Sequence, residues 1–274
     1  MSVSVLLNVI GDEPWIRQAL ACVTWADEIV ITDMGASEAT RQACTDAGAR
    51  VIPVAPQPTV EPARATGVEQ CSSDWVLVLD PDEMVPKSLA TVLRALSESN
   101  EHDVVYVPRR NFLLGAELRH TGWGMHPDRQ CRFFRRGSVV FHDAIHSVPT
   151  SADPSRVLLL DVVETNALVH LNYTDMSNYL QKLDRYTTAE AREAEGPPAR
   201  GGRVMRQALR EVWSRYVTYR GFRDGWRGAV LSLLQGTSVL VAWAKQKEAL
   251  VGGTAGILST YEAVADAVVA EHSG

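Results

Sequence analysis

The sequence has only four cysteines among its 274 residues, and they are widely scattered. Cys22, Cys44, Cys71 and Cys131 form no CxxC pair, which excludes a zinc or redox motif of that kind and predicts reduced thiols in a cytosolic protein. No basic segment precedes the first apolar run, so we expect no signal peptide. The longest apolar stretch, 229–244, is broken at 235–238 and is too short and too polar to predict a membrane span.

The common motifs for binding nucleotides or for hydrolysis are missing as well. There is no P-loop, no GxGxxG loop, no GxSxG elbow and no HExxH pair. The net charge of −6 argues against a general affinity for nucleic acid or an anionic membrane, although it leaves room for local basic patches. What remains for handling phosphate is a metal held by acidic residues, helped by arginines in the middle of the chain. These are Arg109, Arg110, Arg129, Arg132, Arg135 and Arg136.

Short apolar runs alternate with helical patterns over the first 110 residues. The predicted strands are 3–10, 28–33, 50–54, 75–79 and 103–109, and the predicted helices are 14–23, 37–48, 62–71 and 86–96. This alternation is typical of an α/β fold with a mainly parallel sheet and helices on both faces. From residue 175 onward the pattern is helical, which predicts a C-terminal helical extension after a less regular middle segment.

Three carboxylates follow one apolar run directly: residues 75–79 (WVLVL) lead into Asp80, Asp82 and Glu83. Like charges this close need a cation, hydrogen bonds or water to stabilise them. In a parallel sheet, ligands bind outside the carboxyl ends of the strands, where we expect both Asp80 and Asp33. Asp80 and Asp82 can hold Mg²⁺ or Mn²⁺, which bridges to phosphate. The structural alternative is an Asp–Pro turn left in water. A haloacid dehalogenase motif is disfavoured because Glu83 stands where Thr or Val is needed.

The segment 122–136 (GWGMHPDRQCRFFRR) places an aromatic residue beside acidic and basic ones. Trp123 can stack on a sugar ring, and Asp128 can take a proton from an acceptor hydroxyl as a general base. The structural alternative is a loop with Trp123 in the core. The remaining histidines, among them His142, His146 and His170, indicate little by themselves.

Taken together, these motifs resemble family 2 glycosyltransferases of the GT-A (Rossmann-like) fold, and among them the bacterial subgroup of lipopolysaccharide-core glucosyltransferases. The matching segments are 25–37, 74–83, 122–136, 144–148, 168–187 and 219–228, in the order of the family. The resemblance implies an inverting transfer of a sugar from a nucleotide-diphosphate sugar to the hydroxyl of a glycan, lipid-linked or natural-product acceptor. It also implies Mg²⁺ or Mn²⁺ as cofactor.

The resemblance also implies roles for individual residues. Asp33 contacts the nucleotide base or ribose, Asp80 lies at the ribose and the metal, and Asp82 ligates the metal. Asp128 is the expected base. Arg132 and His170 assist the diphosphate, His170 also serves as a further metal ligand, and Trp123 belongs to the nucleotide-sugar site.

The resemblance further implies two domains, a catalytic domain over 1–173 and a helical extension over 174–274. The extension is expected to mediate homodimerisation or a peripheral contact with the inner face of the membrane. Three family motifs are altered, at 11–13, 36–40 and 146–147. They motivate an alternative, a non-catalytic descendant that binds a sugar or partner through the same cleft. A nucleotidyltransferase is a third reading, disfavoured because 11–18 lacks a glycine-rich basic loop.

Overall fold

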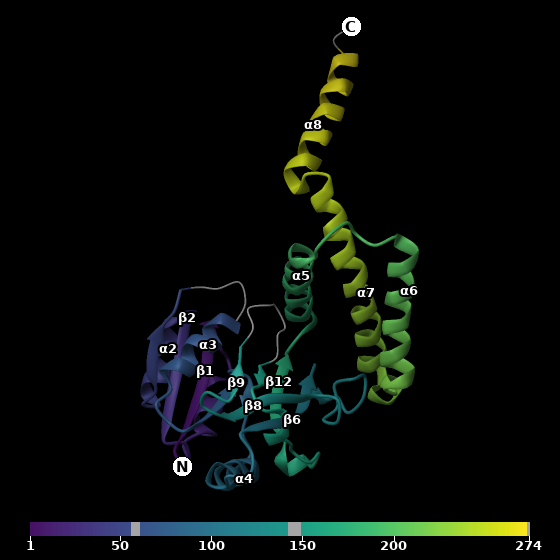
Figure 1. The fold of residues 1–274 in the computed structure, drawn as a ribbon. Helices are drawn as coiled ribbons and strands as arrows, with labels where there is room; N and C mark the ends of the chain where they lie inside the picture. The colour runs from purple at the N-terminus through teal and green to yellow at the C-terminus, as the bar shows by residue number, and fades with distance from the viewer. Residues whose placement is uncertain (56–60, 142–148, 273–274) are drawn as a thin grey trace. The chain divides into compact units, whose positions relative to one another are not determined.

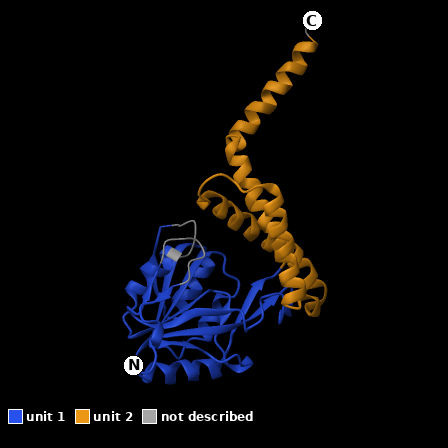
Figure 2. Ribbon diagram, turned by 45° about the vertical axis from the view of Figure 1, so that its right-hand side comes forward, with its two compact units in different colours: residues 1–174 blue, residues 175–274 orange. Residues whose placement is uncertain are grey.

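The computed structural model describes residues 1–55, 61–141 and 149–272. The chain forms two compact units, residues 1–174 and residues 175–274 (Figure 2). The first unit is an α/β fold and the second is made of helices. Whether the boundary at 173/174 separates independently folding domains stays a prediction.

The first unit is built on a ten-stranded sheet (Figure 1). Its main order is β3 (Arg50–Pro53), β2 (Glu28–Ala36), β1 (Val3–Gly11), β4 (Trp75–Leu79), β8 (Arg129–Arg135), β6 (Val104–Leu113), β12 (Leu168–Tyr173) and β5 (Glu83–Met84). The short strands β7 (Ala116–Glu117) and β11 (Val157–Leu159) pair with β6. A separate antiparallel pair is formed by β9 (Val139–Val140) and β10 (Thr150–Ser151).

The sheet is parallel from β3 to β4, as the alternating pattern predicts. β8 differs because it is antiparallel to both of its neighbours, β4 and β6. It follows β6 without a crossover helix, and a chain that returns through a loop pairs antiparallel. The insertion of β8 between β4 and β6 brings Arg132 beside the end of β4.

Helices cover both faces of the sheet, as expected. α1 (Ile16–Ala21), α2 (Glu38–Asp46) and α4 (Lys87–Glu98) share one apolar core with the odd-numbered residues of β1, and α3 (Glu61–Gln70) shares the other core with Leu6. Two 3₁₀ turns, Pro154–Arg156 and Glu164–Asn166, complete the unit. α3 lies very close to the sheet, since a Cβ on Gly67 would come within 2.6 Å of the Leu6 side chain. This packing holds α3 against the sheet, and Arg64 of the same helix contacts Asp80 after β4.

The second unit consists of α5 (Met176–Glu193), α6 (Gly201–Trp213), α7 (Gly225–Leu250) and α8 (Gly253–Glu271). α6 and α7 pair as a hairpin joined by a π-helical turn (Ser214–Thr218) and a 3₁₀ turn (Gly221–Asp224). Their backbones approach closely at Gly236, where an added Cβ would lie 2.9 Å from the Ala208 carbonyl oxygen. α8 buries none of its residues.

One helical segment, Gly221–Leu250, is long and apolar enough to cross a membrane by length and composition. This differs from the expectation for 229–244, because the helix extends the apolar run at both ends. Only 28% of its most apolar part is buried. Core helices of soluble proteins also meet the criteria of length and composition, and α7 makes a polar contact with α5, since Gln235 Nε2 donates to Tyr179 Oη over 2.9 Å.

Candidate active site

The turn after β4 is locked by hydrogen bonds between its first and last acidic residues. The Glu83 amide donates to the Asp80 carbonyl oxygen over 2.9 Å, and the Asp80 amide donates to Glu83 Oε2 over 3.0 Å. β5 then pairs with β12, which sets Glu83 opposite His170. The acids therefore stand at the carboxyl end of β4, where the sequence predicts a site.

Glu83 points inward and is fully buried. Its Oε1 accepts hydrogen bonds from Arg132 Nη2 over 2.8 Å and from Arg109 Nη1 over 3.0 Å. A buried carboxylate is strongly destabilising unless it is paired in this way. Glu83 is therefore the structural member of the acidic trio, and its two arginines organise the rest of the site.

Asp80 is held by two arginines, one on each oxygen. Arg132 Nη2 donates to Oδ2 over 2.5 Å, and Arg64 of α3 donates to Oδ1. Burial raises the pKa of Asp80, but the charges of Arg132 and Arg64 outweigh it and hold the pKa well below its ordinary value. The cost of crowding the acids is thus offset by guanidinium groups, and Asp80 is ionised at neutral pH.

Asp128 is the most completely hydrogen-bonded carboxylate of this group. Arg109 donates to both of its oxygens, over 3.0 and 3.1 Å, Asn111 Nδ2 donates over 2.6 Å, and Gln130 Nε2 donates over 2.6 Å. Burial raises its pKa, but the charge and hydrogen bonds of Arg109 lower it below the ordinary value overall. A carboxylate in this state accepts a proton poorly, so the geometry favours a positioning role. Its predicted role as general base stays untested.

His170 and Asp82 face one another at the exposed edge of the cluster. The Asn111 amide nitrogen is occupied by two acceptors, Asp128 Oδ2 and the Trp123 carbonyl oxygen, so Asn111 Oδ1 must accept from His170 Nδ1, 2.7 Å away. His170 Nε2 then presents its lone pair to Asp82 Oδ1 at 3.5 Å, unless it is protonated. Two electron-rich atoms that face each other require a positive charge between or beside them.

These contacts form one continuous network. It runs from Asp80 through Arg132, Glu83, Arg109, Asp128, Asn111 and His170 to Asp82. Together with Arg64 it contains four carboxylates and three guanidinium groups, so it is acidic by one charge when His170 is neutral. We refer to these nine residues as the acid–arginine network.

The network offers a divalent cation two ligands and no more. Within the described ranges no group of three or more His, Cys, Asp or Glu side chains is arranged around a metal position. Asp82 and His170 nevertheless fit a Mg²⁺ or Mn²⁺ ion whose other ligands are phosphate oxygens and water, because Mg²⁺ is usually bound in this way. Asp80, the other predicted metal ligand, has both oxygens engaged by arginines. It would have to exchange one of them to reach a metal.

Two predicted site residues lie apart from the network. The Asp33 carboxylate accepts from the amides of Gly35 and Ala36, over 2.9 and 2.7 Å, and from Arg41 Nε over 2.6 Å. Burial raises the pKa of Asp33, and these hydrogen bonds lower it overall. β2 continues past Asp33 to Ala36, so Asp33 shapes the loop after the strand as well as standing near its end.

Trp123 is half-buried, and its backbone carbonyl oxygen accepts from Asn111 of the network. Its ring lies 5.9 Å from the ring of Tyr173, centroid to centroid. The structure thus places Trp123 beside the site without showing what its ring would contact. Its assignment to the sugar stays a prediction.

The sequence did not predict that Arg64 and Asn111 would belong to the network. Arg64 comes from a helix that is distant in sequence, and no local pattern links it to Asp80. The segment 144–148 and the residues His142, Asp143 and His146 lie outside the described residues.

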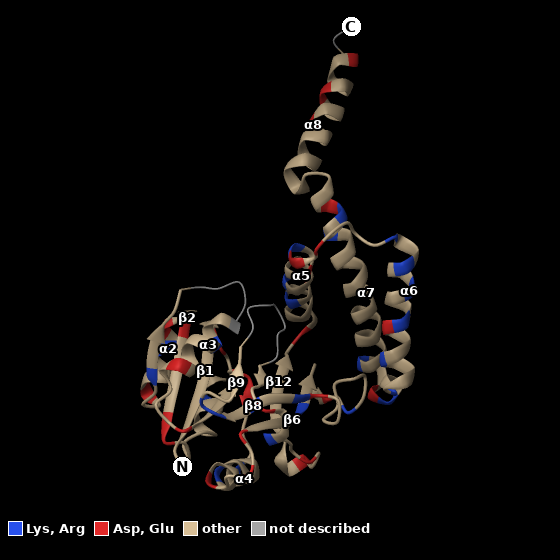
Figure 3. Cartoon of the chain, viewed as in Figure 1, with Lys and Arg blue, Asp and Glu red and all other residues tan. Residues whose placement is uncertain are grey.

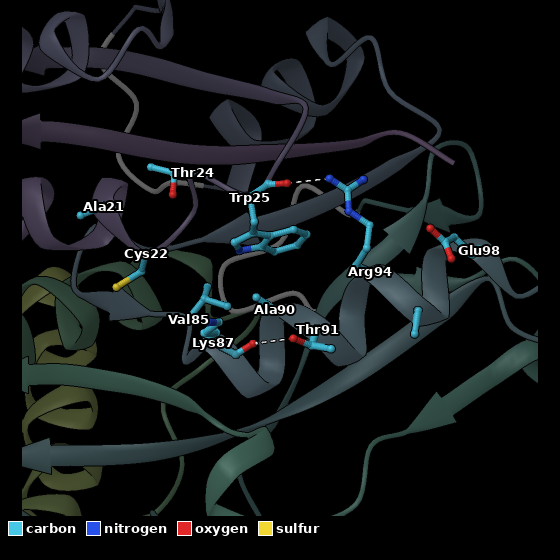
Figure 4. A pocket seen from close by; sticks show the side chains of 11 residues that line it. Ala21, Cys22, Thr24, Trp25, Val85, Lys87, Ala90, Thr91, Arg94 and Glu98 are labelled. Carbon is cyan, nitrogen blue, oxygen red and sulfur yellow. Dashed lines mark hydrogen bonds between the residues drawn. The ribbon is translucent and has the colours of Figure 1, made fainter.

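A separate pocket of about 730 Å³ lies between the end of α1 and α4 (Figure 4). The Trp25 ring forms part of its wall, and Arg94 closes it on one side by donating to the Trp25 carbonyl oxygen over 2.6 Å and to Asp27 over 2.7 Å. No residue of the acid–arginine network lines it. The candidate site is therefore defined by its charges and hydrogen bonds and not by this pocket.

Comparisons with known proteins match a large part of the chain. The model of the family described as "Glycosyl transferase family 2" matches residues 4–152, more than half of the chain. A lipopolysaccharide core biosynthesis glycosyltransferase, LpsC of Rhizobium meliloti (strain 1021), is 25% identical over 196 residues, which cover 70% of this chain and 71% of LpsC.

Solved structures with similar folds match a smaller part. A mycobacterial protein has a TM-score of 0.36 at 21% identity, over 40% of this chain and 41% of its own. Glucosyl-3-phosphoglycerate synthase from Mycobacterium tuberculosis, solved with Mn²⁺, uridine diphosphate and phosphoglyceric acid, has a TM-score of 0.34 at 21% identity, over 42% and 44%. The chain spans less than half the length of these two structures.

Proposed function

The chain belongs to glycosyl transferase family 2, and on this basis we propose that it transfers a sugar from a nucleotide-diphosphate sugar to an acceptor hydroxyl with the help of Mg²⁺ or Mn²⁺. The family and the mainly parallel α/β fold expected from the sequence are thereby confirmed, as is the enzyme class. The observation that carries the proposal is the acid–arginine network at the carboxyl end of β4, the edge where a parallel sheet binds its ligands.

The arginines of the network are proposed to receive the diphosphate. Arg64 and Arg132 already bind an anionic group, the Asp80 carboxylate, and a guanidinium fork suits phosphate oxygens equally well. Arg64 is the more accessible of the two, with 18% of its side chain exposed against 5% for Arg132. We assign the first phosphate contact to Arg64 and a supporting charge to Arg132. If Arg64 turns to the phosphate, it releases Asp80 Oδ1, which can then meet the ribose or the metal.

Asp82 and His170 are proposed to hold the divalent ion. An ion bound there would supply Lewis-acid stabilisation of the negative charge that develops on the departing nucleoside diphosphate. Asn111 fixes the His170 ring by accepting from Nδ1, which would leave the Nε2 lone pair available to a metal. Asp128 in turn orients Asn111.

The reaction proposed is an inverting displacement. The bond between the sugar anomeric carbon and the phosphate oxygen breaks, a bond from that carbon to the acceptor oxygen forms, and the acceptor proton passes to a base. Asp128 is the residue that the family resemblance implies for this step. Asp33 at the nucleotide and Trp123 at the sugar complete the proposed site.

We also propose that the protein works in the cytoplasm, and that its helical extension contacts either a second copy or the inner face of the membrane. LpsC, a relative of this chain, is named for lipopolysaccharide core biosynthesis. An acceptor that is part of a lipid-linked glycan would bring the enzyme to a membrane surface.

A thermal-shift screen tests the donor and the metal together. Purified protein is heated with nucleoside diphosphates and nucleotide sugars, with Mn²⁺ present and then chelated. We expect one nucleotide class to raise the melting temperature only when metal is present. A complete absence of shifts would contradict the proposal. Shifts without turnover of any donor would support the non-catalytic alternative.

A further inference from the structure

Positive charge is concentrated in one part of an otherwise acidic chain. Between Arg200 and Arg227 the sequence has eight arginines and only two acidic residues, whereas the whole chain has a net charge of −6. The segment covers α6, the two turns of the hairpin and the start of α7. In Figure 3 the basic residues gather along α6 and at this turn, while α8 has no basic residue at all.

Most of these arginines are exposed and have no acidic partner. Among the described residues no ion pair is formed by Arg203, Arg206 and Arg210 of α6 or by Arg220 and Arg223 of the turn. Arg215, by contrast, is paired with Glu211 at 2.6 Å. Unpaired arginines that share one surface create a positive potential that attracts a polyanion.

Large apolar side chains are exposed among the arginines. On α6, Met205, Leu209 and Trp213 follow one another at intervals of four and are 49%, 62% and 65% exposed. The buried residues Val204 and Ala208 each directly precede one of these exposed residues, so the buried and the exposed apolar rows lie side by side on α6. The apolar surface of α6 therefore extends beyond the part that is buried.

The turn continues this exposed apolar surface. Tyr219, Phe222 and Trp226 are 46%, 52% and 57% exposed. Phe222 packs edge-on against Tyr216 at 6.2 Å, and Arg227 stacks over Trp226 at 4.7 Å, so the aromatic rings are held in place. We call the five exposed arginines and these six exposed apolar residues the arginine–aromatic surface.

We propose that the arginine–aromatic surface binds the anionic face of a phospholipid bilayer, with α6 and the hairpin turn lying in the plane of the headgroups. Arginines attract anionic headgroups, aromatic rings settle at the headgroup level, and aliphatic side chains enter the acyl boundary. This inference specifies the membrane contact proposed above. It does not depend on the sugar-transfer chemistry.

Other occupants fit less well. A symmetric contact with a second copy would bring the same arginines against themselves, and like charges that face each other disfavour such an interface. Nucleic acid would satisfy the charges and could stack on the aromatic rings. Nucleic acid would not bury the exposed aliphatic side chains of Met205, Leu209 and Val217, whereas a bilayer would. The combination of charge with aliphatic side chains favours lipid.

The test is co-sedimentation of the full chain with vesicles, without donor or acceptor. We expect binding to vesicles containing about one-third phosphatidylglycerol, weakening as salt rises, and little binding to pure phosphatidylcholine. The variant Arg203→Gln/Arg206→Gln/Arg210→Gln should bind roughly 100-fold more weakly. The control Lys87→Gln/Arg185→Gln/Arg192→Gln removes the same charge from exposed positions elsewhere and should bind like the wild type.

A second variant, Phe222→Ser/Trp226→Ser, keeps the charges and tests the apolar part. We expect it to bind anionic vesicles about tenfold more weakly. Circular dichroism of each variant checks that the helices are intact. The inference is overturned if the wild type does not bind anionic vesicles, or if the arginine variant and its control bind them equally. It is also overturned if the wild type is a dimer that Phe222→Ser/Trp226→Ser dissociates. Because no donor is present, each of these failures leaves the proposed transferase function untouched.

Discussion

Asp80 and Glu83 accept hydrogen bonds from the same guanidinium nitrogen, Nη2 of Arg132. This shared donor explains how one short turn tolerates acids at positions 80, 82 and 83. Two of the three are neutralised from within the protein, and only Asp82 is left facing His170. The turn is thereby fixed before any ligand arrives, which is what a site for a charged nucleotide needs.

Removing the charge of Glu83 should destabilise the protein. Glu83→Gln leaves Arg109 and Arg132 facing each other with less negative charge between them, in a fully buried location. We expect the free energy of unfolding to fall by about 2 to 4 kcal/mol. Urea denaturation measures this, with the exposed Glu98→Gln as control. A loss equal to that of the control would show that the burial of Glu83 matters little.

The variant Asp128→Asn distinguishes between two roles for Asp128, a general base and a positioning residue. Both oxygens of Asp128 are taken by hydrogen bonds, so we expect the change to loosen Arg109 and Asn111 and to lower both donor affinity and melting temperature. A pure base would lose only kcat, by about 10²- to 10⁴-fold, with donor affinity and stability unchanged. Donor binding, turnover and melting temperature measured on one preparation decide between the two roles.

Glu28 should make stability depend on pH in the acid range. Burial raises its pKa, but hydrogen bonds from Ser4, Ser72 and Arg50 lower it overall, from 4.5 to about 2. Because the folded-state value is the lower one, the ionised group stabilises the fold above pH 4.5. This stabilisation is lost as the pH falls toward 2.

The variant Glu28→Gln should therefore be less stable than the wild type at pH 7, by about 1 to 2 kcal/mol after allowance for partial exposure of the group. The difference should shrink below pH 4.5 and disappear near pH 2. Urea denaturation at several pH values measures it. A difference that does not vary with pH would contradict the account.

Two glycines of the α6–α7 hairpin should respond in opposite ways to alanine. At Gly236 the new Cβ would meet Val212 Cγ2 at 2.4 Å and the Ala208 carbonyl oxygen at 2.9 Å, so we expect a loss of about 1 to 3 kcal/mol. At Gly202 nothing lies within 4 Å, so Gly202→Ala should gain about 0.5 to 1 kcal/mol from helix propensity. Thermal unfolding of both variants tests the close packing. Equal effects would mean that the helices do not approach this closely.

Much of the fold could be predicted because its signals are local. The run 75–79 and the helical periods each depend on neighbours in sequence, and the structure has β4 and the expected helices. The antiparallel insertion of β8 could not be predicted in this way. It depends on which edge of the sheet the returning chain meets.

The candidate site was predictable only in part. Asp80, Asp82, Asp128, Arg132 and His170 were singled out from motifs, and the structure brings them into one network. The partners that set their charge state, such as Arg64 and Asn111, are distant in sequence and have no motif of their own. For the same reason no pattern showed that Glu83 points inward, or that Asp33 is engaged by Arg41.

The central claim is that Asp82 and His170 hold the divalent ion that binds the nucleotide's phosphates. Electron paramagnetic resonance of Mn²⁺ measures this directly, by following loss of the free-ion signal as protein is added with a nucleoside diphosphate present. We predict tight binding by the wild type and by the exposed control Asp161→Asn, and at least tenfold weaker binding by Asp82→Asn and His170→Gln. Equal Mn²⁺ binding by all four proteins would contradict the account.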